Sequence, residues 1–146
     1  MAFPEPVPGL VIRYSYLWRR EYERGQEEGV KDRPCAVVTV VADDQGEKEV
    51  TVLPVTHTPP SDASLAVEIP YATKQRLGLD AARSWVLLSE ANRFLWPGLD
   101  LRMKSPEGGP ESVAFGLLPR ALFKEITGKF GDAVEASLVR VVRRTQ

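Results

Sequence analysis

Arginine, threonine and histidine side chains stand at the two ends of a predicted strand pair in residues 31–60, KDRPCAVVTVVADDQGEKEVTVLPVTHTPP. Arg33 lies twelve residues before Gln45 and Thr56 lies eleven residues after it. A hairpin that turns near Gln45 would therefore place Arg33 and Thr56 close together at its open end. A guanidinium binds phosphate through a planar fork of donors, and a hydroxyl can donate to a phosphate oxygen.

This pair of side chains suits RNA cleavage without a metal ion. The 2′-OH of RNA can attack the neighbouring phosphorus, so a protein need only orient the phosphate, stabilise its developing charge and move protons. We expect Arg33 to stabilise the pentacoordinate phosphate and to act as an acid, and Thr56 to bind the scissile phosphate. The products would carry a 2′,3′-cyclic phosphate and a 5′-OH.

Each of these residues also has a purely structural interpretation. Arg33 could form a strand-end salt bridge with Asp32 or Glu28, and Thr56 could be an ordinary strand residue. His57 is a candidate proton shuttle, but neighbours on a strand face opposite sides, so its side chain should point away from that of Thr56. The single cysteine, Cys35, is predicted to be a small core residue.

Other kinds of catalytic site are disfavoured by the residue types present. The chain has one histidine and one cysteine, too few for a typical metal cluster, and it has no Gly-rich phosphate loop or serine nucleophile elbow. We therefore expect no metal and no cofactor. The net charge of −1 and the pI of about 5.9 mean that any contact with phosphate must come from a local basic patch.

The composition is that of an ordinary globular protein. The 146 residues are 43% hydrophobic and 27% charged, which suits one domain spanning residues 1–146. No apolar run reaches the roughly 20 residues of a membrane helix, and the N-terminus does not resemble a secretory signal. We expect a cytoplasmic protein without a membrane partner.

Short strands dominate the predicted secondary structure. They are expected at residues 9–14, 35–42, 49–55, 65–70, 84–89 and 112–116, with a polar loop over 15–32, a helical turn over 71–78 and a Pro/Gly-rich loop from residue 95. In the tail, apolar residues recur every four positions, at Leu118, Leu122, Ile126, Phe130, Val134, Leu138 and Val142. This spacing predicts C-terminal helix, with a break near Gly131 and Asp132 as the cap of a second helix.

Strands followed by helix predict a mainly β fold with a C-terminal helix, arranged as a small, partly open barrel of the SH3-like kind. The chain also resembles the MazF/PemK toxins of bacterial type II toxin–antitoxin systems. The matching segments are Gly9-Leu-Val-Ile, Gly29, Arg33-Pro-Cys-Ala-Val-Val, Val52-Leu-Pro-Val-Thr56, Val67-Glu-Ile, Ser84-Trp-Val-Leu-Leu and Gly116-Leu-Leu.

The resemblance implies a homodimeric, metal-independent endoribonuclease toxin that cuts single-stranded RNA at short sequences and is neutralised by a cognate antitoxin. The family's catalytic arginine and threonine fall on Arg33 and Thr56. Predicted RNA-binding residues are Trp18, Lys31, His57, Glu90, Asn92 and Arg93. The alternative is a non-catalytic member of the same fold that binds RNA or inhibits a protein target such as gyrase.

The sequence departs from the family pattern at several positions. Leu10 follows the first-strand glycine, where many members carry an acid. Glu90 stands where relatives often have glutamine, and Asn92 replaces a nearby arginine. An acid in an RNA groove repels phosphate unless it accepts hydrogen bonds from a base amino group.

Overall fold

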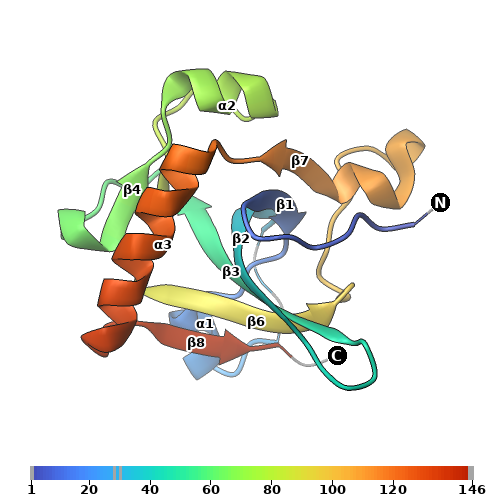
Figure 1. Ribbon diagram of the computed structural model, residues 1–146, viewed down its shortest axis with the longest axis horizontal. Coiled ribbons are helices and arrows are strands. Elements are labelled where there is room, and N and C mark those ends of the chain that lie inside the picture. The colour runs from blue at the N-terminus through green and yellow to red at the C-terminus, as the bar shows by residue number, and fades with distance from the viewer. Residues whose placement is uncertain (1, 28, 30, 145–146) are drawn as a thin grey trace.

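A computed structural model, shown in Figure 1, describes residues 2–27, 29 and 31–144. The fold is mainly β, as predicted, with one open sheet and a long helix near the C-terminus. Its strands are β1 (Leu10–Tyr14), β2 (Arg33–Ala42), β3 (Lys48–Thr56), β4 (Ala66–Glu68), β5 (Trp85–Leu87), β6 (Glu90–Trp96), β7 (Ala114–Leu117) and β8 (Arg140–Arg143). Its helices are α1 (Arg19–Glu23), α2 (Tyr71–Leu77) and α3 (Arg120–Glu135), with 3₁₀ turns at Ala63–Leu65 and Pro106–Val113.

The sheet follows the order β4-β5-β3-β2-β1-β7, and β6 and β8 extend it from a second branch at β3. Strand pairs are antiparallel except β6 with β8, which is parallel. Two apolar clusters lie on opposite faces of the β2–β3 hairpin. One lies under α2 and α3, and the other includes Tyr14 stacked on Phe94 with ring centroids 4.7 Å apart.

The predicted hairpin is confirmed. The Asp43 carboxylate accepts hydrogen bonds from the amides of Gln45 and Glu47, and Gly46 takes a positive φ of 82°. The turn is therefore stabilised by residues within the turn itself. β3 pairs with β2, β5 and β6, which explains why both of its faces are apolar. No helix in the described parts of the chain has the length and apolar character needed to cross a membrane.

Helix α3 corrects the predicted break. It runs without interruption through Gly128 and Gly131, and Asp132 lies inside it rather than capping a second helix. The buried side chains of Leu122 and Ile126 hold this helix against the sheet, which offsets the low helix propensity of glycine. Ser137, with a positive φ of 58°, lies just beyond the end of the helix.

The four-residue spacing in the tail was also misleading. Steps of four overshoot one helical turn by roughly 40°, so an apolar row with this period winds around the helix. Val134 is accordingly 51% exposed while Ile126 is fully buried. Val142 is buried, but it belongs to strand β8, where the sequence predicted helix.

Strand β6 was missed as well. The sequence analysis assigned no strand to residues 90–94 and began a loop at residue 95, whereas β6 runs from Glu90 to Trp96. Glu90, Asn92 and Arg93 give this strand a polar pattern, although Phe94 and Asn92 are both buried. The polar residues are buried by contacts with distant segments, which local patterning does not reveal.

A buried guanidinium joins several of these segments. The side chain of Arg144 is 2% exposed, and it forms an ion pair with Asp100 at 3.0 Å. It also donates to the backbone oxygens of Ser15 at 2.7 Å and Glu27 at 3.3 Å, and to the Asn92 side chain at 3.1 Å. The end of the described chain is thereby tied to the loop over residues 15–32, at Ser15 and at Glu27.

Replacing Arg144 with methionine should destabilise the fold by about 3–5 kcal/mol, because a buried Asp100 would lose its cation. The matched control is Arg143→Met at the neighbouring last position of β8, whose side chain is 67% exposed and pairs with Glu49. Arg143→Met should lower the free energy of unfolding by about 1 kcal/mol or less. Urea denaturation of both variants measures the difference, and equal losses would contradict the assigned role of Arg144.

Replacing Gly131 with alanine should raise the free energy of unfolding by roughly 0.5–1 kcal/mol, because a Cβ there meets no atom within 4 Å and alanine favours helix. Gly46→Ala is the control, since its positive φ makes any side chain strained. In thermal denaturation, Gly131→Ala should raise the melting temperature and Gly46→Ala should lower it. A loss of stability in Gly131→Ala would indicate that the helix is interrupted near Gly131, and it would contradict the continuous α3.

Candidate functional site

Arg33 begins β2 and Thr56 ends β3, so both residues lie at the open end of the β2–β3 hairpin. Cys35 pairs with Pro54, and continuing this register by two residues places Arg33 opposite Thr56. Arg33 Nη1 donates to the backbone oxygen of Val55 at 3.3 Å. The two side chains line two separate cavities at this end of the hairpin, which are described below.

Trp18 holds the guanidinium from one side. The Arg33 guanidinium carbon lies 4.7 Å from the centroid of the Trp18 ring, a cation–π contact, and Arg20 lies at 5.8 Å from the same ring. Arg33 Nε is buried without a hydrogen-bond partner in the described chain. The indole thus fixes the plane of the guanidinium without neutralising its charge.

The salt bridge considered for Arg33 does not form with Asp32. That carboxylate instead lies 3.4 Å from Arg13 and 3.5 Å from Arg102. Glu28, the other acid considered, lies outside the described residues. Among the residues that the structure describes, no carboxylate forms an ion pair with Arg33, so its charge is available to an anion.

Asn92 orients the loop that carries Trp18. It is fully buried, its Oδ1 accepts from the amide of Leu17 at 2.9 Å, and its Nδ2 donates to the backbone oxygen of Leu17 at 2.8 Å. Arg144 donates to the same Oδ1. The predicted RNA contact by Asn92 is therefore corrected, because its fully buried side chain cannot reach a ligand and instead positions the loop.

Glu90 lies beside the loop at the start of β6. One carboxylate oxygen accepts hydrogen bonds from the Tyr16 hydroxyl and the Arg19 amide, each at 3.0 Å. Burial raises the pKa of Glu90, and the hydrogen bonds and the charges of Arg19 and Arg20 oppose this shift only in part. Glu90 therefore has a structural role at the start of α1 while its carboxylate also faces a cavity.

That cavity has a volume of about 290 Å³ and places Thr56 near aromatic and charged side chains. Its lining consists of Trp18, Arg20, Thr56, Thr58, Pro59, Pro60, Ser61, Leu87 and Glu90. Thr56 Oγ1 accepts from the Thr58 amide at 3.1 Å, which leaves its own O–H able to donate to a ligand. We call this space the Thr56 cavity.

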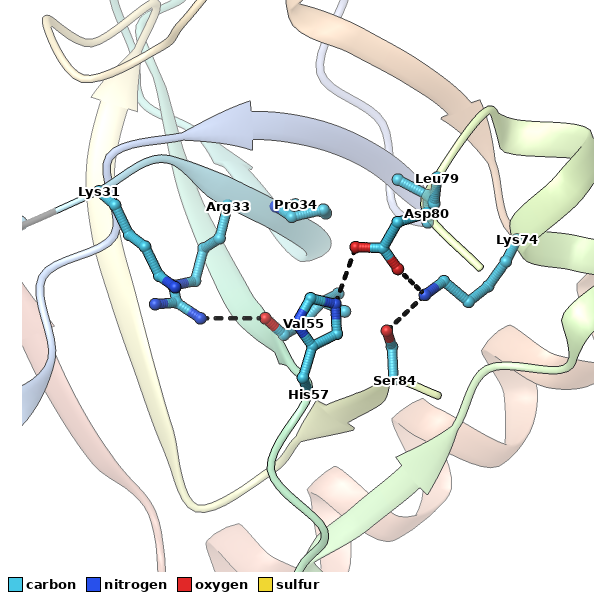
Figure 2. A pocket seen from close by; sticks show the side chains of 9 residues that line it. All are labelled: Lys31, Arg33, Pro34, Val55, His57, Lys74, Leu79, Asp80 and Ser84. Carbon is cyan, nitrogen blue, oxygen red and sulfur yellow. Dashed lines mark hydrogen bonds and ion pairs between the residues drawn. The ribbon is translucent and has the colours of Figure 1, made fainter. Parts of the chain in front are cut away.

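A second, smaller cavity of about 80 Å³ lies on the other side of the hairpin end (Figure 2). Its lining consists of Lys31, Arg33, Pro34, Val55, His57, Lys74, Leu79, Asp80 and Ser84. We call it the His57 cavity. His57 and Thr56 line different cavities, which agrees with the expectation that neighbouring strand residues point to opposite sides.

Three polar residues of the His57 cavity were missed by the sequence analysis. Lys74 comes from α2, Asp80 from the turn after it, and Ser84 precedes β5. The pairing of Thr56 with Trp85 brings this segment beside His57. The predicted strand over residues 84–89 was the available signal, but its pairing with β3 could not be read from local sequence.

Of the remaining predicted RNA contacts, Lys31 lies at the site and Arg93 does not. Lys31 lines the His57 cavity together with Arg33. Arg93 instead donates to the Thr51 hydroxyl at 2.9 Å and lies 4.0 Å from Glu49, in the middle of the β3–β6 pair. Cys35 is fully buried and burial raises its pKa, so it is a core residue as predicted.

No protein-family model matches the chain, and no curated protein matches it. Within the described residues, no group of three or more His, Cys, Asp or Glu side chains could hold a metal ion. The two cavities and Arg33, which lines one of them and contacts Trp18 of the other, are therefore the basis for the function.

Glu90 should make folding stability depend on pH. Because its folded pKa is raised above 4.5, the folded state binds the proton more tightly, and stability should fall as pH rises from about 4.5 through the folded pKa. Glu90→Gln should remove this fall while keeping an acceptor for Arg19.

The free energy of unfolding of Glu90→Gln and of the parent is measured by urea denaturation between pH 4 and pH 8. The difference between the two proteins is then compared across this pH range. Glu68→Gln is the control, because hydrogen bonds from Arg83 lower the pKa of Glu68 below 4.5, so its difference from the parent should stay nearly flat above pH 4.5. A flat difference for Glu90→Gln would show that the carboxylate is not desolvated.

Proposed function

We propose that this chain is a metal-independent, sequence-selective endoribonuclease of the MazF/PemK toxin type. It cleaves single-stranded RNA by attack of the 2′-OH, inhibits growth, and is neutralised by a cognate antitoxin. In this proposal the protein acts in the cytoplasm as a homodimer. The open, mainly antiparallel sheet with α3 packed against it is compatible with the partly open, SH3-like barrel that this assignment requires.

The observation that carries the proposal is the position of Arg33 and Thr56 at the same open end of the β2–β3 hairpin. The guanidinium is held by Trp18 and Val55 and forms no ion pair with a described carboxylate. A phosphate is the ligand whose charge and oxygen geometry match a fixed guanidinium next to a hydroxyl donor. Lys31 and Arg20 add positive charge on the two sides.

The reaction needs groups of the chain and of the RNA, water for proton exchange, and no metal ion. The 2′-oxygen bonds to phosphorus as the bond from phosphorus to the 5′-oxygen breaks, which leaves a 2′,3′-cyclic phosphate and a 5′-OH. Arg33 stabilises the charge on the non-bridging oxygens, and Thr56 donates to one of them. Trp18 keeps the guanidinium in its plane, so little reorganisation is needed as charge develops.

A second candidate function is a non-catalytic member of the same fold that binds RNA or inhibits a protein such as gyrase. The observation that favours it is Glu90, whose carboxylate faces the Thr56 cavity and opposes phosphate there when ionised. Filter binding of RNA and a gyrase supercoiling assay test this candidate. Binding or inhibition without any cleavage would favour it over the nuclease.

The nuclease is tested by incubating the protein with a long unstructured RNA in EDTA and mapping the new ends. We expect cuts at a short recurring sequence, with cyclic phosphate and 5′-OH termini. Arg33→Ala should lower kcat/KM on the order of 10²–10³-fold, since it removes the main stabilising charge. Thr56→Val should lower it about tenfold or more through loss of one hydrogen bond to a charged group.

Arg83→Ala is the matched control, because this exposed arginine pairs with Glu68 outside both cavities. It should cleave like the parent. Cleavage that requires added Mg²⁺, or an Arg33→Ala variant as fast as the parent, would contradict the proposed mechanism.

A further inference from the structure

His57 is held in a fixed orientation at the mouth of its cavity. Its Nε2 lies 2.8 Å from Asp80 Oδ2, and its side chain is 59% exposed (Figure 2). When Asp80 is ionised it can only accept, so Nε2 must carry the hydrogen. The other ring nitrogen, Nδ1, has no partner in the described chain and is the one able to exchange a proton with a ligand.

Asp80 is itself fixed from behind by a buried cation. Lys74 is 3% exposed, and its Nζ donates to Asp80 Oδ1 at 2.5 Å, to Ser84 Oγ at 2.6 Å and to the backbone oxygen of Ala82. All three ammonium hydrogens therefore have acceptors. The hydrogen bond from Lys74 is the main reason that the pKa of Asp80 is lowered, so this carboxylate stays ionised in mildly acidic solution.

This arrangement differs from an ordinary surface ion pair, which is mobile and contributes little. A carboxylate with one oxygen on a buried lysine and the other on an imidazole cannot rotate away without breaking the lysine contact. The Ala82 amide adds a hydrogen bond to Asp80 Oδ1 at 3.2 Å. The chain thus places an oriented histidine in the same cavity as Arg33 and Lys31.

The proposed cleavage lacks a proton acceptor without His57. An arginine guanidinium keeps its proton under all ordinary conditions, and a threonine hydroxyl is a poor base. Glu90 lines the other cavity and already accepts two hydrogen bonds. An imidazole with a free nitrogen is the group in the Arg33 cavity suited to take a proton near neutral pH.

We propose that His57 is the general base of the cleavage reaction and that Asp80, held by Lys74, is its positioning residue. This inference rests on the proposed nuclease function. Nδ1 takes the proton of the 2′-OH as the 2′-oxygen bonds to phosphorus. The bond to the 5′-oxygen breaks, that oxygen takes a proton from water in the open cavity, and the imidazolium returns its proton to solvent. Arg33 then serves charge stabilisation alone, in place of the acid role expected from the sequence.

The orientation of the ring can be measured without any activity. The chain has one histidine, so the ring nitrogens of His57 give a single set of signals in nitrogen-15 NMR. The neutral ring should be the Nε2–H tautomer, and Asp80→Asn should weaken that preference. Asp62→Asn is the control, because Asp62 accepts hydrogen bonds from Ser64 and does not line the His57 cavity. An Nδ1–H tautomer in the parent would overturn the proposal.

The role in catalysis is tested on RNA in EDTA with the parent, His57→Ala, Asp80→Asn and Arg33→Ala side by side. His57→Ala should lower kcat at least 10²-fold, with affinity for a non-cleavable 2′-deoxy oligonucleotide unchanged. Added imidazole should restore part of the rate to His57→Ala and none to Arg33→Ala. Asp80→Asn should lower kcat less than His57→Ala does and change the pH profile of kcat/KM.

The outcomes separate the two proposals. If the parent cuts RNA and His57→Ala cuts at the same rate with the same pH profile, the general-base assignment is wrong and the nuclease stands. A loss in His57→Ala that imidazole does not rescue, together with weakened binding of the 2′-deoxy oligonucleotide, also overturns it. If the folded parent leaves RNA intact, both proposals fail.

Discussion

The buried Arg144 guanidinium is the contact on which the geometry of the site depends. A charge that is removed from water is stable only when its donors meet acceptors and an opposite charge lies close. Asp100, Ser15, Glu27 and Asn92 supply these groups from segments that are far apart in the chain. The ion pair and hydrogen bonds of Arg144 therefore hold the polar loop that begins at Ser15 against β6.

The loop in turn determines where Trp18 lies. Asn92 binds both backbone groups of Leu17, and Glu90 accepts from the Arg19 amide, so the backbone on each side of Trp18 is held by β6. Trp18 then covers one face of the Arg33 guanidinium. A polar network of buried residues thus supports an aromatic contact. That contact orients Arg33, which pairs with no carboxylate of the described residues, at the hairpin end.

The parts of the fold that follow local chemistry could be predicted from the sequence. The Asp43 turn and the β-branched residues of β2 are sufficient to indicate the hairpin, and Gly78 in the left-handed conformation ends α2 at the expected place. The juxtaposition of Arg33 and Thr56 follows from the hairpin. Strands β6 and β8 could not be predicted in this way. The polar residues of β6 do not show the pattern of a buried strand, and Val142 of β8 falls by chance in the four-residue apolar spacing that indicated a helix.

The same limit applies to the site. Asn92 is polar, as exposed strand residues usually are, yet it is fully buried and hydrogen-bonds to Leu17 and to Arg144. Lys74 and Asp80 look like a solvated helix and turn in sequence, yet strand pairing at Trp85 carries them to His57. Contacts between residues far apart in the chain decided these roles, and a single sequence contains no direct record of such contacts.

The position of Arg33 between two cavities has a mechanical consequence for any polymer that uses both. Thr56 and His57 present their side chains to opposite sides of the hairpin end, so a chain that reaches both must bend sharply around the arginine. A single strand, whose backbone torsions are free, can adopt such a path at little cost, whereas a base-paired duplex resists bending over this length. The stiffness of the substrate, as well as its sequence, would then select what enters the site.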